Sequence, residues 1–453
     1  MLNLSSLLER FSERTPLPVM ARGLLERHLS GAALDDWFEN VAEKQYTKKL
    51  LFSSLYDLMT QVVFRHQPSV NTAYQNAVQP LNASLSAVYA KLNNIETQTS
   101  AALVSLSADK SAALIQEMGA EEAAIIPGYR IRILDGNALG ARAHRLAVTR
   151  SSTAAPLPGK SLNVYEPALG LITHTLPCED AYTQERALLS SLAEQIEVND
   201  LWVADRNFCT TDFLTELQAR GAAGLIREHG QIRFQPLKAM GDAVRIETGE
   251  VSEQRIQLTT GGKEGILLRR IRVKLDKPDR NGEDSIYLLT QVPPEKASAA
   301  ELADLYRKRW KIEVAFLKMT VQLRCEINTL GYPKAALFGF AVAAVAFNAL
   351  AVIMAALRVA HPEVDIEQEV STYYIANEMA NMAESLDTII DTEDWQPIAD
   401  ANQADMAEWL VTLAKRAQLR KYKKHPRGKK KPAQPRSTDP KKPHVSTARL
   451  LRK

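Results

Sequence analysis

The feature that most restricts the fold of this 453-residue chain is a 23-residue segment without a charge, residues 335–357. As a helix it is long enough to cross a bilayer, but a helix buried on all sides in a large protein has the same composition. The segment is rich in alanine, it contains Asn348, and no second apolar span follows it. We therefore expect a buried core helix, and no membrane as a partner.

Charge is distributed unevenly along the chain. From Lys415 onward there are 16 Lys or Arg and one acid, Asp439, which leaves 40 basic and 52 acidic side chains in the rest. A Lys/Arg block with Pro and Gly, such as residues 421–431, cannot build a core and stays solvated. We interpret residues 421–453 as a basic disordered tail that binds phosphates. A tail that only increases solubility is the alternative.

The cysteines and the N-terminus bear on the cellular compartment. Cys178, Cys209 and Cys325 lie far apart with no CxxC pair, which argues against a zinc site or a disulfide framework. No signal peptide is evident in the first ten residues. These features predict a cytoplasmic protein.

Hydrophobic periodicity divides the chain into regions. Residues 1–120 are helical in pattern, and residues 70–96 resemble either a helix-turn-helix DNA reader with Tyr89, Lys91 and Asn93 exposed, or an ordinary helical hairpin. After Gly128, strand patterns begin to alternate with helices, which predicts an α/β mixed sheet. The predicted regions are a helical N-terminal DNA-binding region (1–120), the first part of a catalytic core (125–228), a β-rich insertion (229–298), the helical second part of the core (299–360), a helical C-terminal region (361–420) and the tail (421–453).

Residues that suit phosphate and metal chemistry gather on one predicted helix, residues 299–323. Tyr306, Arg309 and Glu313 are spaced by three and four residues and therefore share one helix face. Asp135 and Asp205 each follow a predicted strand, so that adjacent strands would bring them together. Phosphoryl transfer on DNA uses two Mg²⁺ ions, and three converging carboxylates are a minimal site for them. Arg309 can hold a phosphate through two hydrogen bonds.

The sequence resembles the DDE transposases of the insertion sequence 4 group, which have a Tyr-(2)-Arg-(3)-Glu-(6)-Lys signature. The match consists of Tyr306, Arg309 and Glu313, together with segments 134–137 and 203–208 around the two aspartates. The resemblance implies an RNase H-like core and metal-dependent cleavage and strand transfer of DNA. It implies Asp135, Asp205 and Glu313 as catalytic metal ligands for two Mg²⁺ (Mn²⁺ is possible). It also implies double-stranded DNA as partner, a homodimer that joins two transposon ends, and action at the nucleoid.

One signature position departs from the family. Position 320, where Lys is expected, is Thr320, and Lys318 lies two residues earlier. We keep Lys318 as a DNA-binding candidate with Tyr306, Arg309 and Arg206; a structural ion pair is the alternative for Arg206. His144 is a weaker neighbour of the site, and a structural role is the simpler interpretation. The alternative functions are a catalytically impaired, transposase-derived DNA-binding protein and an RNase H-like DNA nuclease.

Overall fold

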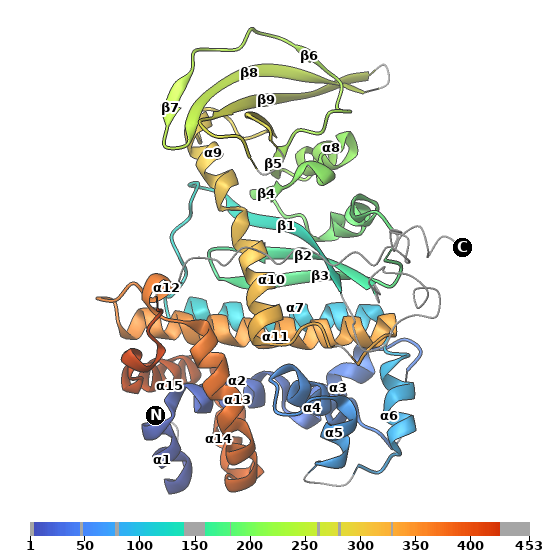
Figure 1. The fold of residues 1–453 in the computed structure, drawn as a ribbon, viewed down its shortest axis with the longest axis vertical. Coiled ribbons are helices and arrows are strands. Elements are labelled where there is room, and N and C mark those ends of the chain that lie inside the picture. The colour runs from blue at the N-terminus through green and yellow to red at the C-terminus, as the bar shows by residue number, and fades with distance from the viewer. Residues whose placement is uncertain are drawn as a thin grey trace, which may run out of the picture.

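The computed structural model describes residues 4–45, 49–77, 81–139, 159–181, 183–260, 263–279, 282–327 and 329–425. In these residues a mixed ten-stranded sheet stands above helical layers, as Figure 1 shows. The predicted α/β class is confirmed. His144 and residues 426–453 of the predicted tail lie outside the described residues. The strands are β1 (Arg130–Leu139), β2 (Gly159–Glu166), β3 (Leu171–Cys178), β4 (Asp200–Ala204), β5 (Ala223–Arg227), β6 (Phe234–Pro236), β7 (Val244–Ile246), β8 (Gly249–Thr260), β9 (Lys263–Leu275) and β10 (Ser285–Thr290).

The helices form the N-terminal, central and C-terminal parts of the described chain. They are α1 (Ser6–Arg14), α2 (Pro16–Leu29), α3 (Gly31–Val41), α4 (Phe52–Val63), α5 (Val70–Gln75), α6 (Leu85–Leu92), α7 (Thr97–Glu117), α8 (Thr211–Ala219), α9 (Ala299–Lys308), α10 (Trp310–Gln322), α11 (Pro333–Ala360), α12 (Ile366–Glu369), α13 (Thr372–Ile389), α14 (Gln396–Ala399) and α15 (Gln403–Arg416). Four 3₁₀ helices join them: η2 (Glu185–Gln195), η3 (Arg206–Phe208), η4 (Thr392–Trp395) and η5 (Leu419–Tyr422).

The sheet has the strand order β3-β2-β1-β4-β5-β10-β9-β8-β6, with β7 paired to β8. Strands β1, β4 and β5 are parallel, and the remaining pairs are antiparallel. The β-rich insertion is continuous with the core, because β10 pairs with both β5 and β9. The long β8–β9 hairpin therefore extends the same sheet. Sequence periodicity predicts strands but not which edge they join, so this continuity could not be read from the pattern.

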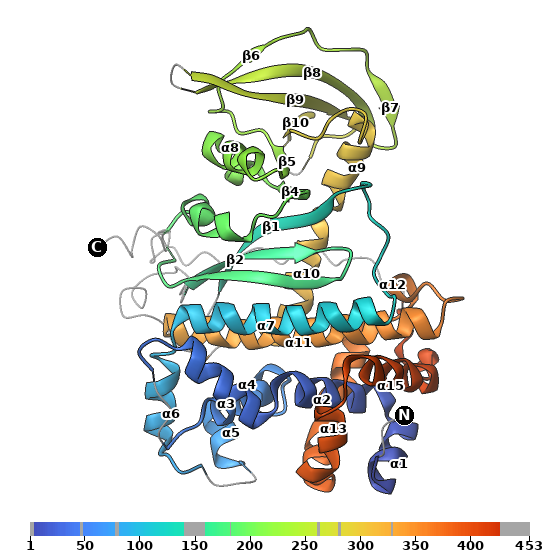
Figure 2. The ribbon, with the colours of Figure 1, turned by 180° about the vertical axis from the view of Figure 1, so that it is seen from behind.

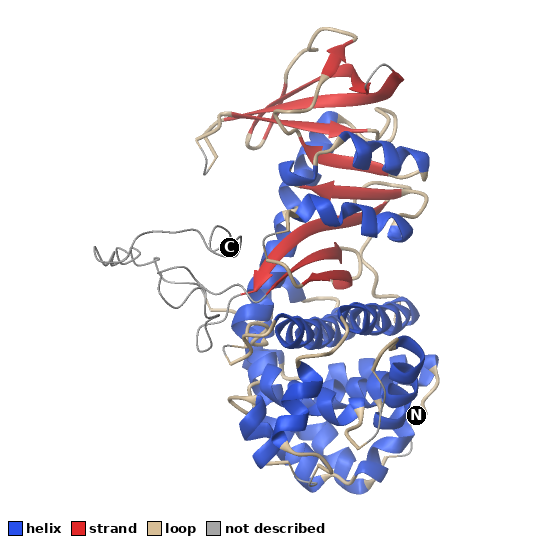
Figure 3. Ribbon diagram, turned by 90° about the vertical axis from the view of Figure 1, so that its right-hand side faces the viewer, coloured by secondary structure: helices blue, strands red, loops and turns tan. Residues whose placement is uncertain are grey.

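The uncharged segment forms α11, which lies beside α7 beneath the sheet; Figures 2 and 3 show this pair from behind and from the side. It is the one described helix long and apolar enough to cross a membrane, and 94% of its most apolar window is buried in the protein. Asn348 is fully buried. Its amide donates to the Ile172 carbonyl (3.0 Å) and accepts from the Ile172 N–H (2.9 Å), which satisfies both groups at the start of β3. The prediction of a buried core helix is confirmed.

The N-terminal helices corrected one expectation. Ser84 caps α6, accepting a hydrogen bond from the Ala87 N–H at 3.3 Å. However, Tyr89, Lys91 and Asn93 are only partly accessible. The Lys91 ammonium donates to the Leu50 carbonyl at 2.7 Å. These three side chains are therefore less exposed than predicted, and a DNA-reading role for them stays a prediction.

Candidate active site

Asp135 and Asp205 stand on neighbouring parallel strands. The pairing of β1 with β4 ends with Leu134 opposite Ala204, so each aspartate is the next residue along its strand. The predicted strand end at Leu134 was wrong, because β1 continues to Leu139 by pairing with β2. Asp135 nevertheless marks the end of the parallel pairing. The side chain of Asp205 also caps η3, accepting from the Asn207 N–H at 2.8 Å.

The predicted single helix over residues 299–323 is divided at Arg309 into α9 and α10. Ser298 and Glu301 form a capping box that fixes the start of α9. At the junction the Arg309 N–H bonds to the Tyr306 carbonyl (3.0 Å) and the Ile312 N–H to the Arg309 carbonyl (3.2 Å). These three-residue bonds tighten the helix without ending it. Helix α10 then packs against β1 and presents Glu313 near Asp135.

The Arg309 guanidinium joins the two parts of the site. Its Nη1 lies 3.1 Å from Asp135 Oδ2, and its Nη2 lies 3.0 Å from Glu313 Oε1. The side chains of Arg309 and Asp135 are 15% and 17% exposed, whereas that of Glu313 is 32% exposed. The site is therefore half-open, with its charges accessible to a ligand that approaches α10.

The charges of this cluster favour a cation. The pKa of Asp135 is raised to about 6 in total. Burial is the largest cause; Arg309 opposes it, and the nearby carboxylates of Asp205 and Glu313 add to the increase. One guanidinium thus faces three carboxylates, whose hard oxygens suit Mg²⁺. Among the described residues, no three His, Cys, Asp or Glu side chains are gathered closely enough to hold a metal as they stand. Arg309 contacts two of the three carboxylates and neutralises part of their charge.

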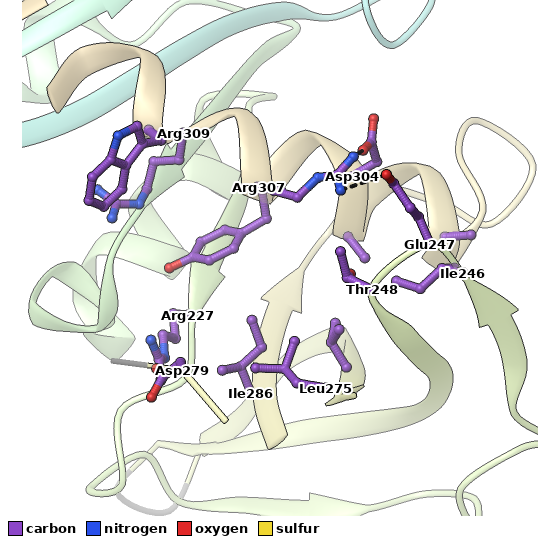
Figure 4. A pocket seen from close by; sticks show the side chains of 15 residues that line it. Arg227, Ile246, Glu247, Thr248, Leu275, Asp279, Ile286, Asp304, Arg307 and Arg309 are labelled. Atoms are coloured by element: carbon purple, nitrogen blue, oxygen red, sulfur yellow. Dashed lines mark hydrogen bonds and ion pairs between the residues drawn. The ribbon is translucent and has the colours of Figure 1, made fainter. Parts of the chain in front are cut away.

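Tyr306 lies beside the cluster on the wall of a cavity of about 540 Å³ between α9 and the insertion strands. Figure 4 shows Arg309 on one side of this cavity and Ile286 and Leu275 on the other. The Arg309 guanidinium carbon is 5.9 Å from the centre of the Tyr306 ring. Burial raises the pKa of Tyr306 to about 12. Its hydroxyl therefore stays protonated at neutral pH and can donate a hydrogen bond.

The other predicted DNA-binding residues lie elsewhere. Arg206 forms an ion pair with Glu283, in which Arg206 Nη2 lies 2.7 Å from Glu283 Oε1. This is the structural ion pair given above as the alternative for Arg206. Lys318 lines a separate cavity next to α12, beside Glu367. Thr320 donates to the Phe316 carbonyl at 3.0 Å, and its own carbonyl accepts from Arg65 of the helical layer. A DNA contact of Arg206 or Lys318 stays a prediction.

Sequence reasoning missed Glu185, which connects the two aspartate segments. Its Oε2 accepts from Asn207 Nδ2 at 2.9 Å, two residues after Asp205. Its other oxygen lies over Gly136, where a Cβ would be only 2.1 Å from it. A larger residue at position 136 would therefore displace the Glu185 carboxylate from this place. The only trace in the sequence is the glycine after Asp135, and a single Asp-Gly pair has many explanations.

The middle of the chain is similar to a known protein family. Residues 128–346 match the model of a family described as the transposase DDE domain. This region contains Asp135, Asp205 and Glu313. No curated protein matches the chain significantly. Among solved structures, the chain is similar to a piggyBac transposase in a synaptic complex with hairpin DNA, with 9% identity, a TM-score of 0.40, and coverage of 88% of this chain and 87% of that one.

Proposed function

We propose that this protein is a DNA transposase of the DDE type, which moves an insertion sequence by cut-and-paste transposition. The observation that carries the proposal is the arrangement of carboxylates inside the region that matches the family model. Asp135 and Asp205 are side by side on parallel strands, and Arg309 links Asp135 to Glu313 of α10. The resemblance to the insertion sequence 4 group, through Tyr306, Arg309 and Glu313, supports the more specific assignment.

In the proposed mechanism, Asp135, Asp205 and Glu313 hold two divalent ions, with Mg²⁺ as the natural ion and Mn²⁺ as a substitute. When bound, such ions neutralise phosphate charge and activate the attacking oxygen. Arg309 transfers its guanidinium from the two carboxylates to a DNA phosphate, where its planar fork can make two hydrogen bonds. The Tyr306 hydroxyl donates a hydrogen bond to the same strand. The first reaction hydrolyses the phosphodiester at the transposon end, and the freed 3′-hydroxyl then attacks target DNA.

The proposed partners follow from this reaction. The protein binds double-stranded DNA of the transposon ends and of the target, acts at the nucleoid in the cytoplasm, and brings two ends together as a homodimer. Arg206 and Lys318 are further candidates for phosphate contacts, and the basic C-terminal tail for contacts with either DNA. The helical N-terminal region is the candidate for end recognition.

The test is metal-dependent cleavage of a labelled transposon end by the Glu313→Gln variant. We expect roughly a thousandfold loss of strand cleavage, because a metal ligand contributes several kcal/mol to the transition state, with end binding retained. Glu216→Gln is the matched control, since Glu216 also pairs with an arginine four residues away but on the exposed face of α8. Cleavage retained by Glu313→Gln would overturn the assignment.

A catalytically impaired, transposase-derived DNA-binding protein is the second candidate. Thr320 at the signature position and the turning of Lys318 toward α12 favour it. The same assay separates the two: an impaired protein binds the ends but neither nicks nor joins them. An RNase H-like nuclease would nick DNA without transferring strands.

A further inference from the structure

A second cavity, of about 580 Å³, lies along α10 and shares Trp310 with the 540 Å³ cavity at Tyr306. We call it the α10 groove. It is enclosed by α10, α11, α12 and the turn between β2 and β3, and its rim includes the last described residues of the chain. Five cationic side chains line it against three acidic ones. The cations are Lys308, Lys311, Lys318, Arg358 and Lys424, and the acids are Glu122, Asp365 and Glu367.

The acidic side chains of the α10 groove already have partners. Glu122 lies 3.7 Å from Lys311, and Glu367 lies 3.1 Å from Arg358. Asp365 caps α12, accepting from the Gln368 N–H at 3.0 Å. Of the cations, Lys308 also has a partner, since it lies 3.0 Å from Asp304. Five cations against these four acids leave a small excess of positive charge at the groove.

Lys318 is the cation that lacks such a partner. It is partly buried, and among the described residues it forms neither an ion pair nor a hydrogen bond. Burial lowers the pKa of its ammonium; Glu367 raises it, and Lys424 and Lys311 lower it further. A partly buried cation without a bonded counter-charge is unfavourable, so an anion bound in the groove would stabilise this arrangement.

Trp310 connects the α10 groove to the candidate active site. Its side chain lines both the groove and the cavity that contains Tyr306 and Arg309. It is 44% exposed, and Val314, one turn later, is 37% exposed. An exposed indole between a reactive site and a basic groove is the arrangement on which nucleic-acid bases stack.

The chain is basic where it continues beyond the α10 groove. Lys424 lines the α10 groove, and residues 426–453, which follow it, contain ten Lys or Arg and one acid. A cavity of 580 Å³ is in the size range of small-ligand sites. It therefore accommodates a nucleotide but is too narrow for a duplex.

We propose that the α10 groove binds a single-stranded segment of DNA, with a phosphate at Lys318 and Lys311 and a base stacked on Trp310. The proposal rests on the proposed function, in which a strand separated at the carboxylates has to leave the site. The strand passes over Trp310 from the active site into the groove. The cost of the partly buried Lys318 charge is offset when the phosphate arrives.

The test is fluorescence anisotropy of the full-length protein with a labelled oligothymidylate of about ten nucleotides. Trp310→Ala should weaken binding about tenfold, because stacking contributes roughly 1–3 kcal/mol per base. Lys318→Ala should also weaken binding and lower the salt dependence by about 0.7 in the log–log slope, as expected for one lost phosphate contact on a single strand. Lys318→Arg keeps the charge and should bind nearly as well as wild type.

Lys274→Ala is the control, because Lys274 is 60% exposed on β9 and lies 3.9 Å from Glu250. Every variant keeps the C-terminal tail, so tail binding is common to all. Oligothymidylate affinities of Trp310→Ala and Lys318→Ala equal to that of Lys274→Ala would overturn the proposal. The binding assay needs no catalysis. If the variants bind oligothymidylate like the control while the wild type cleaves transposon ends, only the groove proposal is refuted. If the wild type binds oligothymidylate in the groove but does not cleave transposon ends, only the proposed transposase function is refuted.

Discussion

Strand β1 carries two ionic clusters that differ in balance and burial. Near its start, Arg132 lies 3.3 Å from Glu166, and these side chains are 3% and 7% exposed. Arg130 similarly pairs with the fully buried Asp200 at 2.7 Å. Five residues along, Arg309 alone faces the carboxylates of Asp135, Asp205 and Glu313 at a half-open surface. Glu197 also lies 3.1 Å from Arg130, so the first cluster has two arginines and three carboxylates, and most of its charges are buried. The second cluster has one arginine and three carboxylates. We call the first the closed cluster and the second the open cluster.

The difference separates a structural role from a functional one. In the closed cluster, His174 completes the network, with Nδ1 3.0 Å from Arg132 Nη2, and burial with nearby Arg132 lowers the pKa of His174 to about 4. There Arg132, Glu166 and Asp200 are each buried beside an opposite charge of the fold. In the open cluster the carboxylates exceed the cations, which is expected where a ligand supplies the missing positive charge. Three predictions test whether the two clusters differ in role.

The largest expected effect is on stability in the closed cluster. Glu166→Ala leaves Arg132 buried without its carboxylate, which should lower the free energy of unfolding by about 3–5 kcal/mol. Chemical denaturation measures it. Asp276→Asn is the control, because Asp276 pairs with Arg245 at 2.6 Å on the surface, where such pairs contribute little to stability. Equal losses for the two variants would contradict a structural role for the buried pair.

The next effect is the pH dependence of cleavage in the open cluster. Asp135 has to be ionised to hold a metal, and its pKa is raised to about 6. The cleavage rate at limiting Mg²⁺ should therefore fall about tenfold from pH 7 to pH 5. Raising the Mg²⁺ concentration should move the midpoint to lower pH, because metal and proton compete for the carboxylate. A midpoint that stays fixed as Mg²⁺ increases would exclude Asp135 as the titrating ligand.

The smallest effect is a gain of stability from removing a catalytic charge. The folded pKa of Asp135 lies above the ordinary value of 3.8, so its ionisation costs native stability as pH rises from about 4 through 6. Above that range the full cost is present. Asp135→Asn should therefore raise the melting temperature at pH 8 without metal, by an amount on the order of 1 kcal/mol in stability, while abolishing cleavage.

Asp200→Asn on the neighbouring strand provides the matched comparison. Asp200 is fully buried against Arg130, so its replacement should lower the melting temperature. If Asp135→Asn destabilised the protein as much as Asp200→Asn, the two clusters would have the same role and the distinction would fail.

Much of the fold could be predicted because it depends on local pattern. The buried helix over residues 335–357 followed from its run of uncharged, mostly apolar residues. The juxtaposition of Asp135 and Asp205 also followed, since residues after adjacent parallel strands meet at one edge of a sheet. The catalytic roles of these residues stay predictions until cleavage is measured.

What could not be predicted depends on contacts between distant segments. The sequence does not contain the pairing of β10 with β5, so the insertion could not be expected to extend the core sheet. It gave no sign that Glu283 would pair with Arg206, which is 77 residues away in the chain. The direction of Lys318 was also undetermined, because helix geometry fixes an angle around α10 but not what packs beside it.

By itself, the sequence determined the carboxylates, their spacing and the segments that carry them, because helix and strand periods act over a few residues. The tertiary structure decided that one arginine faces three acids, that Glu185 joins the two aspartate segments, and that a basic groove opens behind Trp310. Burial and charge balance arise only when α10, the sheet and the helical layers pack together. These properties separate the open cluster from the closed one, although both lie on the same strand.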